Sequence, residues 1–343
     1  MNRLTFIGSI QLNSPSTGGG VQTKNQHFLR YILSKNVGCR VFDTWKKKSV
    51  LSLIMSLIYI VRTKRSEPII LSISTRGAYY IAKILNLTHL KRRIFYWVAG
   101  GDLAIDLKNV SLKNRRVYDV FTKVVVQCNY LKRDLEELSI TNCAMVPNFK
   151  PVIFKPTIDK AIFEKIRFVY FSRVLIQKGI EEIIQAFKSL GNKNICLDIY
   201  GTLVPPYDEG YFKDFYYLNI NYKGFLDVSV EDGYKQLSEY DVLLFPTYFK
   251  GEGFPGTLLD AFIAGVPVIA SDFHANGEVL VDGYNGLLIP PKDAVALSTA
   301  MNRLISDIDL RKKLRKNAIL TAREYDVEMI LDEAFARLKI FED

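Results

Sequence analysis

The sequence predicts an α/β protein built from two doubly wound Rossmann-like domains, and three observations support this fold class. First, a chain of 343 residues is longer than one ordinary core organises, whereas two domains of roughly 150 to 180 residues fit it. Second, short apolar strands alternate with helical segments in both halves, as in parallel sheets covered by helices on both faces. Third, the proline-rich stretch VPNFKPVIFKPT, residues 146–157, interrupts this alternation near the middle of the chain.

The first half contains five apolar segments of strand length, each followed by a helical segment or a turn. We predict strands at residues 4–10, 39–45, 68–74, 92–100 and 123–127, with helices at 21–34, 46–65, 79–87 and 129–138.

The second half restarts the same alternation after the proline-rich stretch. We predict strands at residues 167–173, 195–201, 221–225, 241–246, 266–272 and 285–290, with helices at 180–190, at 230–237 and from Gly256 onward. Everything after residue 294 has helical character, and residues 326–341 carry apolar side chains at helical spacing. We therefore assign residues 1–150 to the first domain and 151–324 to the second, and expect a helix at about 325–343 to pack back on the first.

The composition is that of a folded globular protein, with 48% apolar and 24% charged residues. The four cysteines form no C-x-x-C pair, and no charged-then-apolar leader precedes the first strand, so a reducing cytoplasm is the expected location. The histidines, His27, His89 and His274, lie far apart in the sequence, so no metal site is expected.

The charge is distributed unevenly along the chain. Residues 1–150 contain 24 Lys and Arg against 8 Asp and Glu, a net charge of +16, whereas the remainder contains 22 against 28, a net charge of −6. A basic half suits nucleic acid, anionic lipid or a phosphorylated substrate, and a solvated basic surface without a partner is the alternative. Because the sequence carries no nucleic-acid reader motif, we expect no nucleic-acid partner.

The segment KKKSVLSLIMSLIYIVRTKR, residues 46–65, encloses an apolar run between two basic clusters. The run is shorter than the roughly 20 apolar residues that span a bilayer. A helix lying in the membrane interface fits it, with basic side chains on headgroup phosphates. A core helix between two strands is the alternative, and both interpretations can hold together.

Ligands of open α/β sheets bind outside the carboxyl ends of the strands, and two glycine-rich or basic stretches stand there. After the first strand, Gly18, Gly19 and Gly20 precede a helix, whose N-terminus suits a phosphate group; a flexible connecting turn is the alternative. In FSRVLIQKG, Arg173 and Lys178 follow the first strand of the second domain. An Arg that grips two oxygens and a Lys that adds a point charge suit a diphosphate, whereas simple surface exposure is the alternative for either residue alone.

The stretch GEGFPGTLLD, residues 251–260, turns at the carboxyl end of the buried strand DVLLFP and begins a helix. Gly253 and Gly256 leave the backbone open, so the N–H groups of residues 256–258 can meet phosphate oxygens. Glu252 and Asp260 are placed to accept hydrogen bonds from hydroxyls. The alternatives are compensation of helix N-terminal charge for Glu252 and an ordinary solvated helix position for Asp260.

At these residues the sequence resembles the retaining glycosyltransferases of family 4, which have the two-domain GT-B fold. Glu252 matches the first position of that family's Glu-x7-Glu motif, and Asp260 stands in place of the second Glu. FSRVLIQKG is similar to the family's Gly-Arg-Leu…Lys-Gly diphosphate site, with Ser172 replacing the glycine. The resemblance also covers the glycine loop, VPN at residues 146–148 and VLVDGYNGLLIPPKD, and thus nearly the whole chain.

The resemblance implies three groups of site residues. Glu252, Arg173 and Lys178 are the expected catalytic residues. The expected donor-binding residues are Gly253, Phe254, Gly256, Thr257, Leu258, Asp260, Gly19, Gly20, Gly201 and His274. The acceptor side is expected at Gly100, Gly101 and Asp102, where many members of the family carry a histidine that this chain lacks; capping of the next segment is the alternative for Asp102.

The activity implied is transfer of a sugar, with retention, from a nucleotide diphosphate sugar to a lipid-linked or oligosaccharide acceptor, as in capsule or O-antigen assembly. No metal and no cofactor are expected, and the location implied is the cytoplasmic face of the membrane. A noncatalytic nucleotide-sugar-binding partner or sensor protein remains the alternative. A dehydrogenase is disfavoured because no G-x-G-x-x-G follows the first strand.

Overall fold

The computed structural model describes residues 3–11, 20–45, 49–158, 165–191 and 194–342. The chain divides into two compact units, each of which is described by itself. The first comprises Met1–Pro151, Gly251–Phe254 and Asp326–Asp343, and the second comprises Val152–Lys250 and Pro255–Tyr325. The division near residue 151 falls in the stretch where the proline-rich sequence places the domain boundary.

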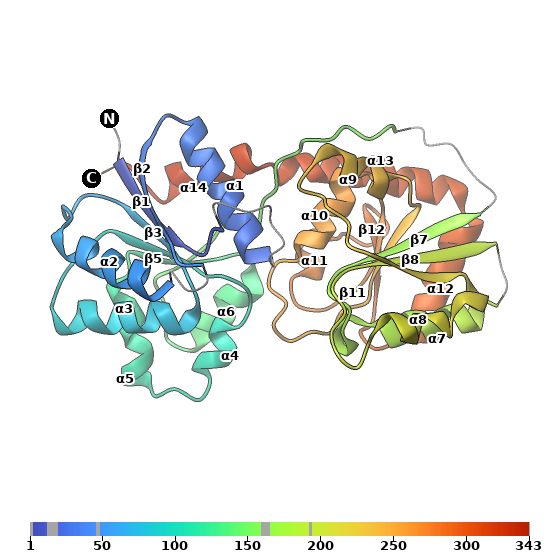
Figure 1. Cartoon of the computed structure of the whole chain (residues 1–343), viewed down its shortest axis with the longest axis horizontal. Helices are drawn as coiled ribbons and strands as arrows, with labels where there is room; N and C mark the ends of the chain where they lie inside the picture. Colours follow the sequence, from blue (N-terminus) through green and yellow to red (C-terminus); the bar gives the residue numbers. More distant parts are fainter. Residues whose placement is uncertain (1–2, 12–19, 46–48, 159–164, 192–193, 343) are drawn as a thin grey trace. The chain divides into compact units, whose positions relative to one another are not determined.

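The first unit is a parallel six-stranded sheet with the strand order β2-β1-β3-β4-β5-β6 (Figure 1). Its strands are β1 (Arg3–Gly8), β2 (Gly38–Asp43), β3 (Ile69–Ser72), β4 (Ile94–Trp97), β5 (Lys123–Val126) and β6 (Cys143–Met145). The direction of strand addition reverses between β1 and β3, where Thr5 pairs with Ile69 and Gly8 with Ser72. This reversal point is where open parallel sheets bind ligands.

The helices of the first unit are mostly crossover connections between parallel strands. They are α1 (Gly20–Ser34), α2 (Ser49–Arg62), α3 (Thr75–Leu87), α4 (Leu103–Leu107), α5 (Leu112–Arg115), the 3-10 helix η2 (Arg116–Val120), α6 (Asn129–Glu137) and the C-terminal α14 (Val327–Arg337). Helix α3 begins where Ser74 accepts a hydrogen bond from the backbone N–H of Gly77, a standard N-cap arrangement.

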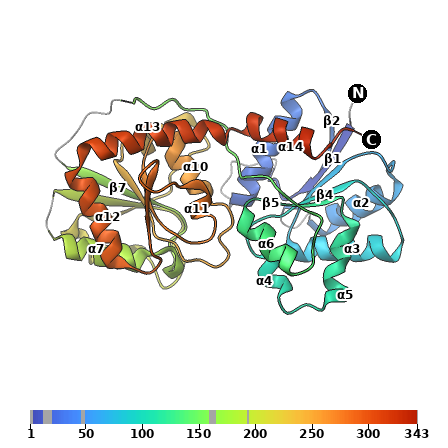
Figure 2. The same ribbon diagram turned by 180° about the vertical axis from the view of Figure 1, so that it is seen from behind.

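Helix α14 lies against α1, as Figures 1 and 2 both show. The ring of Phe335 packs 5.8 Å from Phe28 and 5.5 Å from Tyr31. Tyr31 also donates a 2.6 Å hydrogen bond to Asp332. The side chains of α14 therefore complete the core of the first unit, together with Val146 and Phe149 from the stretch that leads out of it.

The second unit is also a parallel six-stranded sheet, with the order β12-β11-β10-β7-β8-β9. Its strands are β7 (Ile166–Phe171), β8 (Ile195–Tyr200), β9 (Ile220–Gly224), β10 (Val242–Phe245), β11 (Val268–Ser271) and β12 (Gly286–Ile289). Here the direction of strand addition reverses between β7 and β10, which pair through Phe168 and Val242.

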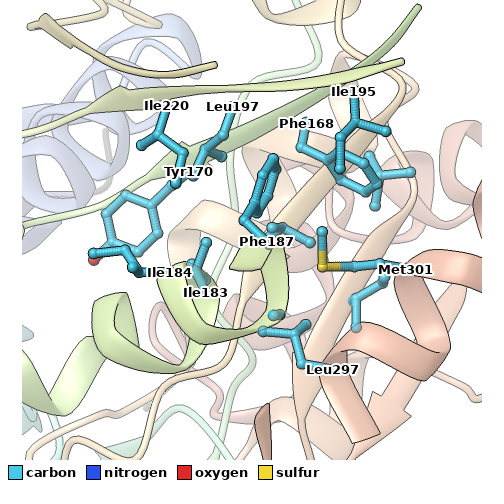
Figure 3. Close-up of a cluster of buried hydrophobic side chains, with 14 of the residues drawn as sticks. Phe168, Tyr170, Ile183, Ile184, Phe187, Ile195, Leu197, Ile220, Leu297 and Met301 are labelled. Carbon is cyan, nitrogen blue, oxygen red and sulfur yellow. The ribbon is translucent and has the colours of Figure 1, made fainter. Parts of the chain in front are cut away.

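Helices cover the second sheet as well. They are the 3-10 helix η3 (Ile176–Lys178), α7 (Ile180–Leu190), α8 (Glu209–Lys213), the 3-10 helix η4 (Tyr216–Leu218), α9 (Glu231–Ser238), α10 (Gly256–Ile263), α11 (Asn276–Val279), α12 (Ala294–Ser306) and α13 (Ile308–Glu324). Side chains of β7, α7 and α12 interdigitate in one buried cluster around Phe168, Phe187 and Met301 (Figure 3). Asp293 and Asp307 cap α12 and α13 by accepting backbone N–H groups.

Two parallel sheets with helical crossovers confirm the predicted fold class. The predicted helix at 180–190 has the limits observed for α7, and each predicted strand overlaps an observed strand. The sequence reading missed β6 and the short helices α4, α5, α8 and α11. Within the described ranges, no helix is both long enough and apolar enough to cross a membrane.

Candidate functional site

The two predicted cations of the second unit lie at the point where strand order reverses. Arg173 follows β7, and the loop that follows β10 carries Phe249. The guanidinium carbon of Arg173 lies 5.6 Å from the centre of the Phe249 ring, and Nζ of Lys178 lies 5.6 Å from the same ring. Lys178 is 5% exposed and also lies 5.0 Å from the ring of Phe245. The two cations thus gather around one aromatic side chain.

The backbone around these cations is held by contacts between neighbouring loops. Tyr170 donates a 2.7 Å hydrogen bond to the carbonyl of Arg173, and the backbone N–H of Tyr248 donates to the carbonyl of Gln177 at 2.8 Å. Gly179, at φ +81°, lies so close to Pro246 that a Cβ would sit 2.4 Å from its carbonyl oxygen. These contacts fix Lys178 between the ends of β7 and β10, which suits an anion of defined geometry.

Gly201 follows β8 and lies directly against the residue before Arg173. At φ +143° it adopts a conformation that favours glycine, and a Cβ there would lie 1.7 Å from the carbonyl oxygen of Ser172. Its N–H donates to Gly224 at 2.8 Å. The structure therefore brings the predicted catalytic residues Arg173 and Lys178 and the predicted donor-binding residue Gly201 to the carboxyl edge of the same sheet.

Glu252 and Gly253 belong to the short segment Gly251–Phe254 that is grouped with the first unit. There they lie against the predicted acceptor loop: a Cβ on Gly101 would stand 2.8 Å from the carbonyl oxygen of Glu252, and one on Gly253 would stand 3.2 Å from the carbonyl carbon of Gly100. Tyr130 donates a hydrogen bond to the carbonyl of Glu252. Burial raises the pKa of Tyr130, and the carboxylates of Glu252 and Asp102 raise it further.

Asp102 precedes α4, but its side chain makes no capping hydrogen bond. The capping alternative that the sequence left open is therefore wrong for this residue. The nearby Gly100 has φ +85°, and none of the described residues would lie within 4 Å of a Cβ there. Phe254, at the end of the Gly251–Phe254 segment, is buried, and its carbonyl accepts a hydrogen bond from Asn148.

Helix α10 begins at Gly256, as the sequence predicts. The backbone N–H of Leu258 already donates to the carbonyl of Pro255 at 3.2 Å. This corrects the prediction that Leu258 offers its N–H to a phosphate, because the first helical turn uses that group. The N–H groups of Gly256 and Thr257, both half-buried residues, stay the candidates at this helix end.

Asp260 is not a solvated helix position. It is 3% exposed and accepts a 2.9 Å hydrogen bond from Tyr234, which lies on α9. Burial raises the pKa of Tyr234 well above its ordinary value, and the nearby carboxylate of Asp260 raises it further. Asp260 thus stands in a fixed orientation, held by a buried phenol.

The remaining predicted residues are exposed or lie outside the described ranges. His274 is exposed at φ +51° in the loop after β11, with its ring centre 3.9 Å from that of Phe273. Gly20 is the exposed first residue of α1. Gly18 and Gly19 lie outside the described residues. Among the residues that are described, no cluster of three His, Cys, Asp or Glu side chains is arranged to hold a metal ion.

Sequence reasoning missed three residues that contact predicted site residues of their own unit: Tyr130 in the first, and Phe249 and Tyr234 in the second. Phe249 stands in the loop after a predicted strand, in TYFK, so its place at a ligand edge could have been noticed. Tyr130 and Tyr234 sit on helices with no motif around them, and only the folded chain brings them to Glu252 and Asp260.

Comparison with known proteins agrees with a ligand site at Arg173 and Lys178 in the second unit. Residues 156–321, most of the second unit, match the family described as glycosyl transferases group 1. This part of the chain is a group 1 glycosyltransferase domain. The match covers β7 through most of α13, and so includes Arg173, Lys178 and the α10 segment.

This chain spans less than half the length of each of two curated relatives that it matches. A capsular polysaccharide biosynthesis glycosyltransferase, CapM of Staphylococcus aureus, is 30% identical over 152 residues, which cover 43% of this chain and 39% of CapM. The N,N'-diacetylbacillosaminyl-diphospho-undecaprenol alpha-1,3-N-acetylgalactosaminyltransferase of Campylobacter jejuni is 34% identical over 102 residues, which cover 30% of this chain and 26% of that enzyme.

The likeness in fold extends over the whole chain. The crystal structure of Anabaena HepE in complex with UDP has a TM-score of 0.74 at 14% identity, and the superposition covers 99% of this chain and 100% of that one. With the two parallel sheets, this likeness establishes the two-domain GT-B fold.

Proposed function

We propose that this protein is a retaining glycosyltransferase of family 4. It transfers a sugar from a nucleotide diphosphate sugar to a lipid-linked saccharide acceptor during synthesis of a bacterial surface polysaccharide, at the cytoplasmic face of the membrane. The observation that carries the proposal is the convergence of Arg173 and Lys178 on Phe249 at the strand-order reversal of the group 1 domain.

The cations explain how such a site drives the reaction. The bond between the anomeric carbon and the diphosphate oxygen breaks, the acceptor oxygen bonds to that carbon on the same face, and the acceptor proton passes to the departing diphosphate. Negative charge therefore grows on the diphosphate as the bond breaks. Arg173 and Lys178, fixed by their loops before the substrate arrives, stabilise this charge without reorganisation.

The relatives support the donor and acceptor classes. HepE is crystallised with UDP, the Campylobacter enzyme is named for a diphospho-undecaprenol substrate, and CapM for capsule synthesis. In the present chain, Glu252 and Asp260 then bind hydroxyls of the donor, and the loop at Gly100–Asp102 receives the acceptor.

Helix α2 supports contact with a membrane. Its outward side chains form an apolar stripe at helical spacing, and each is between 45% and 65% exposed. They are Leu51, Ile54, Met55, Ile58 and Val61. Its opposite face is buried through Ser56 and Ile60. The helix thus packs on the sheet and presents a second apolar face, so the two alternatives open at the sequence level are compatible.

The charges around this stripe favour an anionic bilayer as its partner. Residues 49–93 contain eight Lys and Arg but a single acidic residue, Glu67. That carboxylate is engaged, because it accepts hydrogen bonds from Thr5 and Tyr59. An apolar stripe in a cationic surround is the arrangement of a helix that lies in the plane of an anionic membrane.

The donor assignment is tested by thermal shift with UDP, GDP, ADP, CMP and dTDP. We expect one nucleotide series to stabilise the protein, and Lys178→Met to abolish that shift. Lys188→Met is the matched control, because Lys188 also lies about 5 Å from a phenylalanine ring, Phe215 at 5.2 Å, but at the other end of α7. Equal shifts in the two variants would refute the donor site. Nucleotide binding without transfer to any acceptor would favour a sensor protein.

Membrane contact is tested by flotation with vesicles that contain anionic lipid. The wild-type protein is expected to float, and Ile54→Gln with Ile58→Gln to stay in solution. Leu320→Gln with Met329→Gln removes two apolar side chains of similar exposure, 41% and 50%, from α13 and α14 and is expected to float normally. If the α2 variant floats as well as this control, the stripe is not the membrane contact.

A further inference from the structure

A lysine of the first unit is buried, and no carboxylate of the described residues balances its charge. Lys24, in the second turn of α1, is 5% exposed, and its Nζ donates a 3.3 Å hydrogen bond to the carbonyl of Val98. Burial alone lowers its pKa from 10.5 to about 7. Buried lysines are costly and are seldom retained without a charged partner or a function.

The position of Lys24 is a ligand-binding position by topology. Its neighbour Asn25 joins the ends of β1 and β3, since it donates to the carbonyls of Ser9 and Ser72 and accepts from the hydroxyl of Ser72. These are the two strands between which the order of the first sheet reverses. Lys24 itself reaches Val98, which directly follows β4. Ligands of open parallel sheets bind at such a reversal.

The fold does not need an amine at this place. The carbonyl of Val98 also accepts a 3.1 Å hydrogen bond from Gln127, which follows β5. The backbone of the loop after β1 is held by other side chains of α1, because Gln26 donates to the carbonyl of Ile10. A methionine in place of Lys24 would leave these contacts intact.

The acidic side chains at this edge have other partners. Asp43, at the end of β2, accepts the backbone N–H groups of Ile10 and Trp45. The carboxylate of Asp102, after β4, lies close enough to Tyr130 to raise the pKa of that phenol. Neither contributes to the shift of Lys24, for which desolvation is the only cause. The side chain that shares the Val98 carbonyl with Lys24 is the neutral amide of Gln127, and the adjacent Asn25 bonds to the neutral hydroxyl of Ser72.

We propose that Lys24 is the cationic centre of an oxyanion-binding pocket in the first unit, and that it binds a phosphate or carboxylate group of the acceptor. The neutral amide of Gln127 at the shared Val98 carbonyl supplies a further hydrogen bond, and Gly100, with none of the described residues within 4 Å of a Cβ there, lets a ligand approach. This assignment rests on the proposed function only in calling the ligand an acceptor. An acceptor that binds Lys24 carries a negative charge close to the sheet. This charge belongs either to the diphosphate that links a saccharide to its lipid or to an acidic sugar.

Calorimetric titration with two small anions tests this pocket directly. The background protein carries Arg173→Ala and Lys178→Met, so that the anion site of the second unit is removed. Pyrophosphate represents the lipid-linked diphosphate, glucuronate represents an acidic sugar, and glucose is the neutral control. We expect one of the two anions to bind and Lys24→Met to weaken that binding at least tenfold. The anion that binds identifies the acceptor class.

Lys83→Met, which removes an exposed lysine from α3, is the matched control and is expected to bind as the background does. Circular dichroism and the thermal midpoint verify that Lys24→Met folds; Lys24→Gln is the second variant. If neither anion binds, or if both Lys24 variants bind as the background does, the pocket assignment is overturned. Failure of the donor assignment gives a different result, because nucleotide binding in the otherwise wild-type protein would then be insensitive to Lys178→Met.

Discussion

Tyr234 donates a 2.9 Å hydrogen bond to a carboxylate that is 3% exposed, that of Asp260. Asp260 stands where the resembling family carries a longer Glu, so its reach toward a ligand depends on how it is oriented. The phenol of Tyr234 comes from α9, a different helix, and fixes this orientation. The pair thus links the packing of α9 on α10 to the geometry of the candidate donor site.

Tyr234→Phe is expected to lower the free energy of unfolding by about 1–3 kcal/mol, because it leaves a buried carboxylate with one donor fewer. If Asp260 binds the donor, the affinity for the nucleotide also falls. Tyr211→Phe is the control, since Tyr211 donates to the carboxylate of Glu181, which is partly exposed. Urea unfolding and nucleotide titration measure the two effects. An unchanged nucleotide affinity in a folded Tyr234→Phe protein would argue against a donor role for Asp260.

Arg173→Ala is expected to fold normally and to lose about 100-fold to 1000-fold in turnover, the usual cost of removing one preorganised donor from an oxyanion site. Arg173 is exposed and its guanidinium lies over the ring of Phe249, so little stability depends on it. Steady-state kinetics with the nucleotide sugar found by thermal shift measure the loss. Arg167→Ala, which removes an arginine paired with Glu239 at the amino end of β7, is the control. Turnover within a fewfold of wild type in Arg173→Ala would refute the catalytic assignment.

Because the amine of Lys24 is buried, we expect the free energy of unfolding to depend on pH. Its pKa is about 7 in the folded protein and 10.5 as the ordinary value. Between these two pH values the unfolded chain binds a proton that the folded protein does not, so the free energy of unfolding rises with pH across this window. Below pH 7 the folded protein carries the full cost of a buried charge.

Lys24→Met removes this dependence. We expect the thermal midpoint of the variant to exceed that of the wild type most at about pH 6, and the difference to shrink toward about pH 9, because each unit of pKa difference is worth about 1.4 kcal/mol. Differential scanning calorimetry at several pH values measures it, with Lys83→Met as the exposed-lysine control. If the thermal midpoints of Lys24→Met and the wild type differ by the same amount at every pH, Lys24 does not take up a proton on unfolding.

Much of the fold follows from local sequence. An apolar run predicts strands such as β7, and apolar residues at helical spacing predict helices such as α7. Helices α12, α13 and α14 each begin at a capping Asp. The helices of the region 103–120 could not be predicted in this way, because α4, α5 and η2 are four or five residues long, too short to show helical periodicity. β6 has three residues, too few for an alternating pattern.

The candidate site was predictable where it depends on position after a strand. Arg173 and Lys178 both follow β7, so their proximity is local. Their common partner Phe249 depends on the pairing of β10 with β7, which is set by strand order and not by any motif. Lys24 gave no signal at all, since a lysine in the second turn of an amphipathic helix is ordinarily solvated, and only the packing of α1 on the sheet buries it.

Gly201 offers a test of the loop that carries Arg173. Gly201→Ala places a methyl group where the carbonyl oxygen of Ser172 now lies, 1.7 Å from an ideal Cβ, so the Ser172–Arg173 backbone must move. Gly224→Ala is the matched control: Gly224 also has positive φ, +80°, but none of the described residues would lie within 4 Å of a Cβ there. The control is expected to lose about 1 kcal/mol from backbone strain alone. Gly201→Ala is expected to lose more than this in urea unfolding and to bind nucleotide more weakly, because the guanidinium is displaced from Phe249. Equal losses in the two variants would show that the loop yields without cost and that the position of Arg173 does not depend on Gly201.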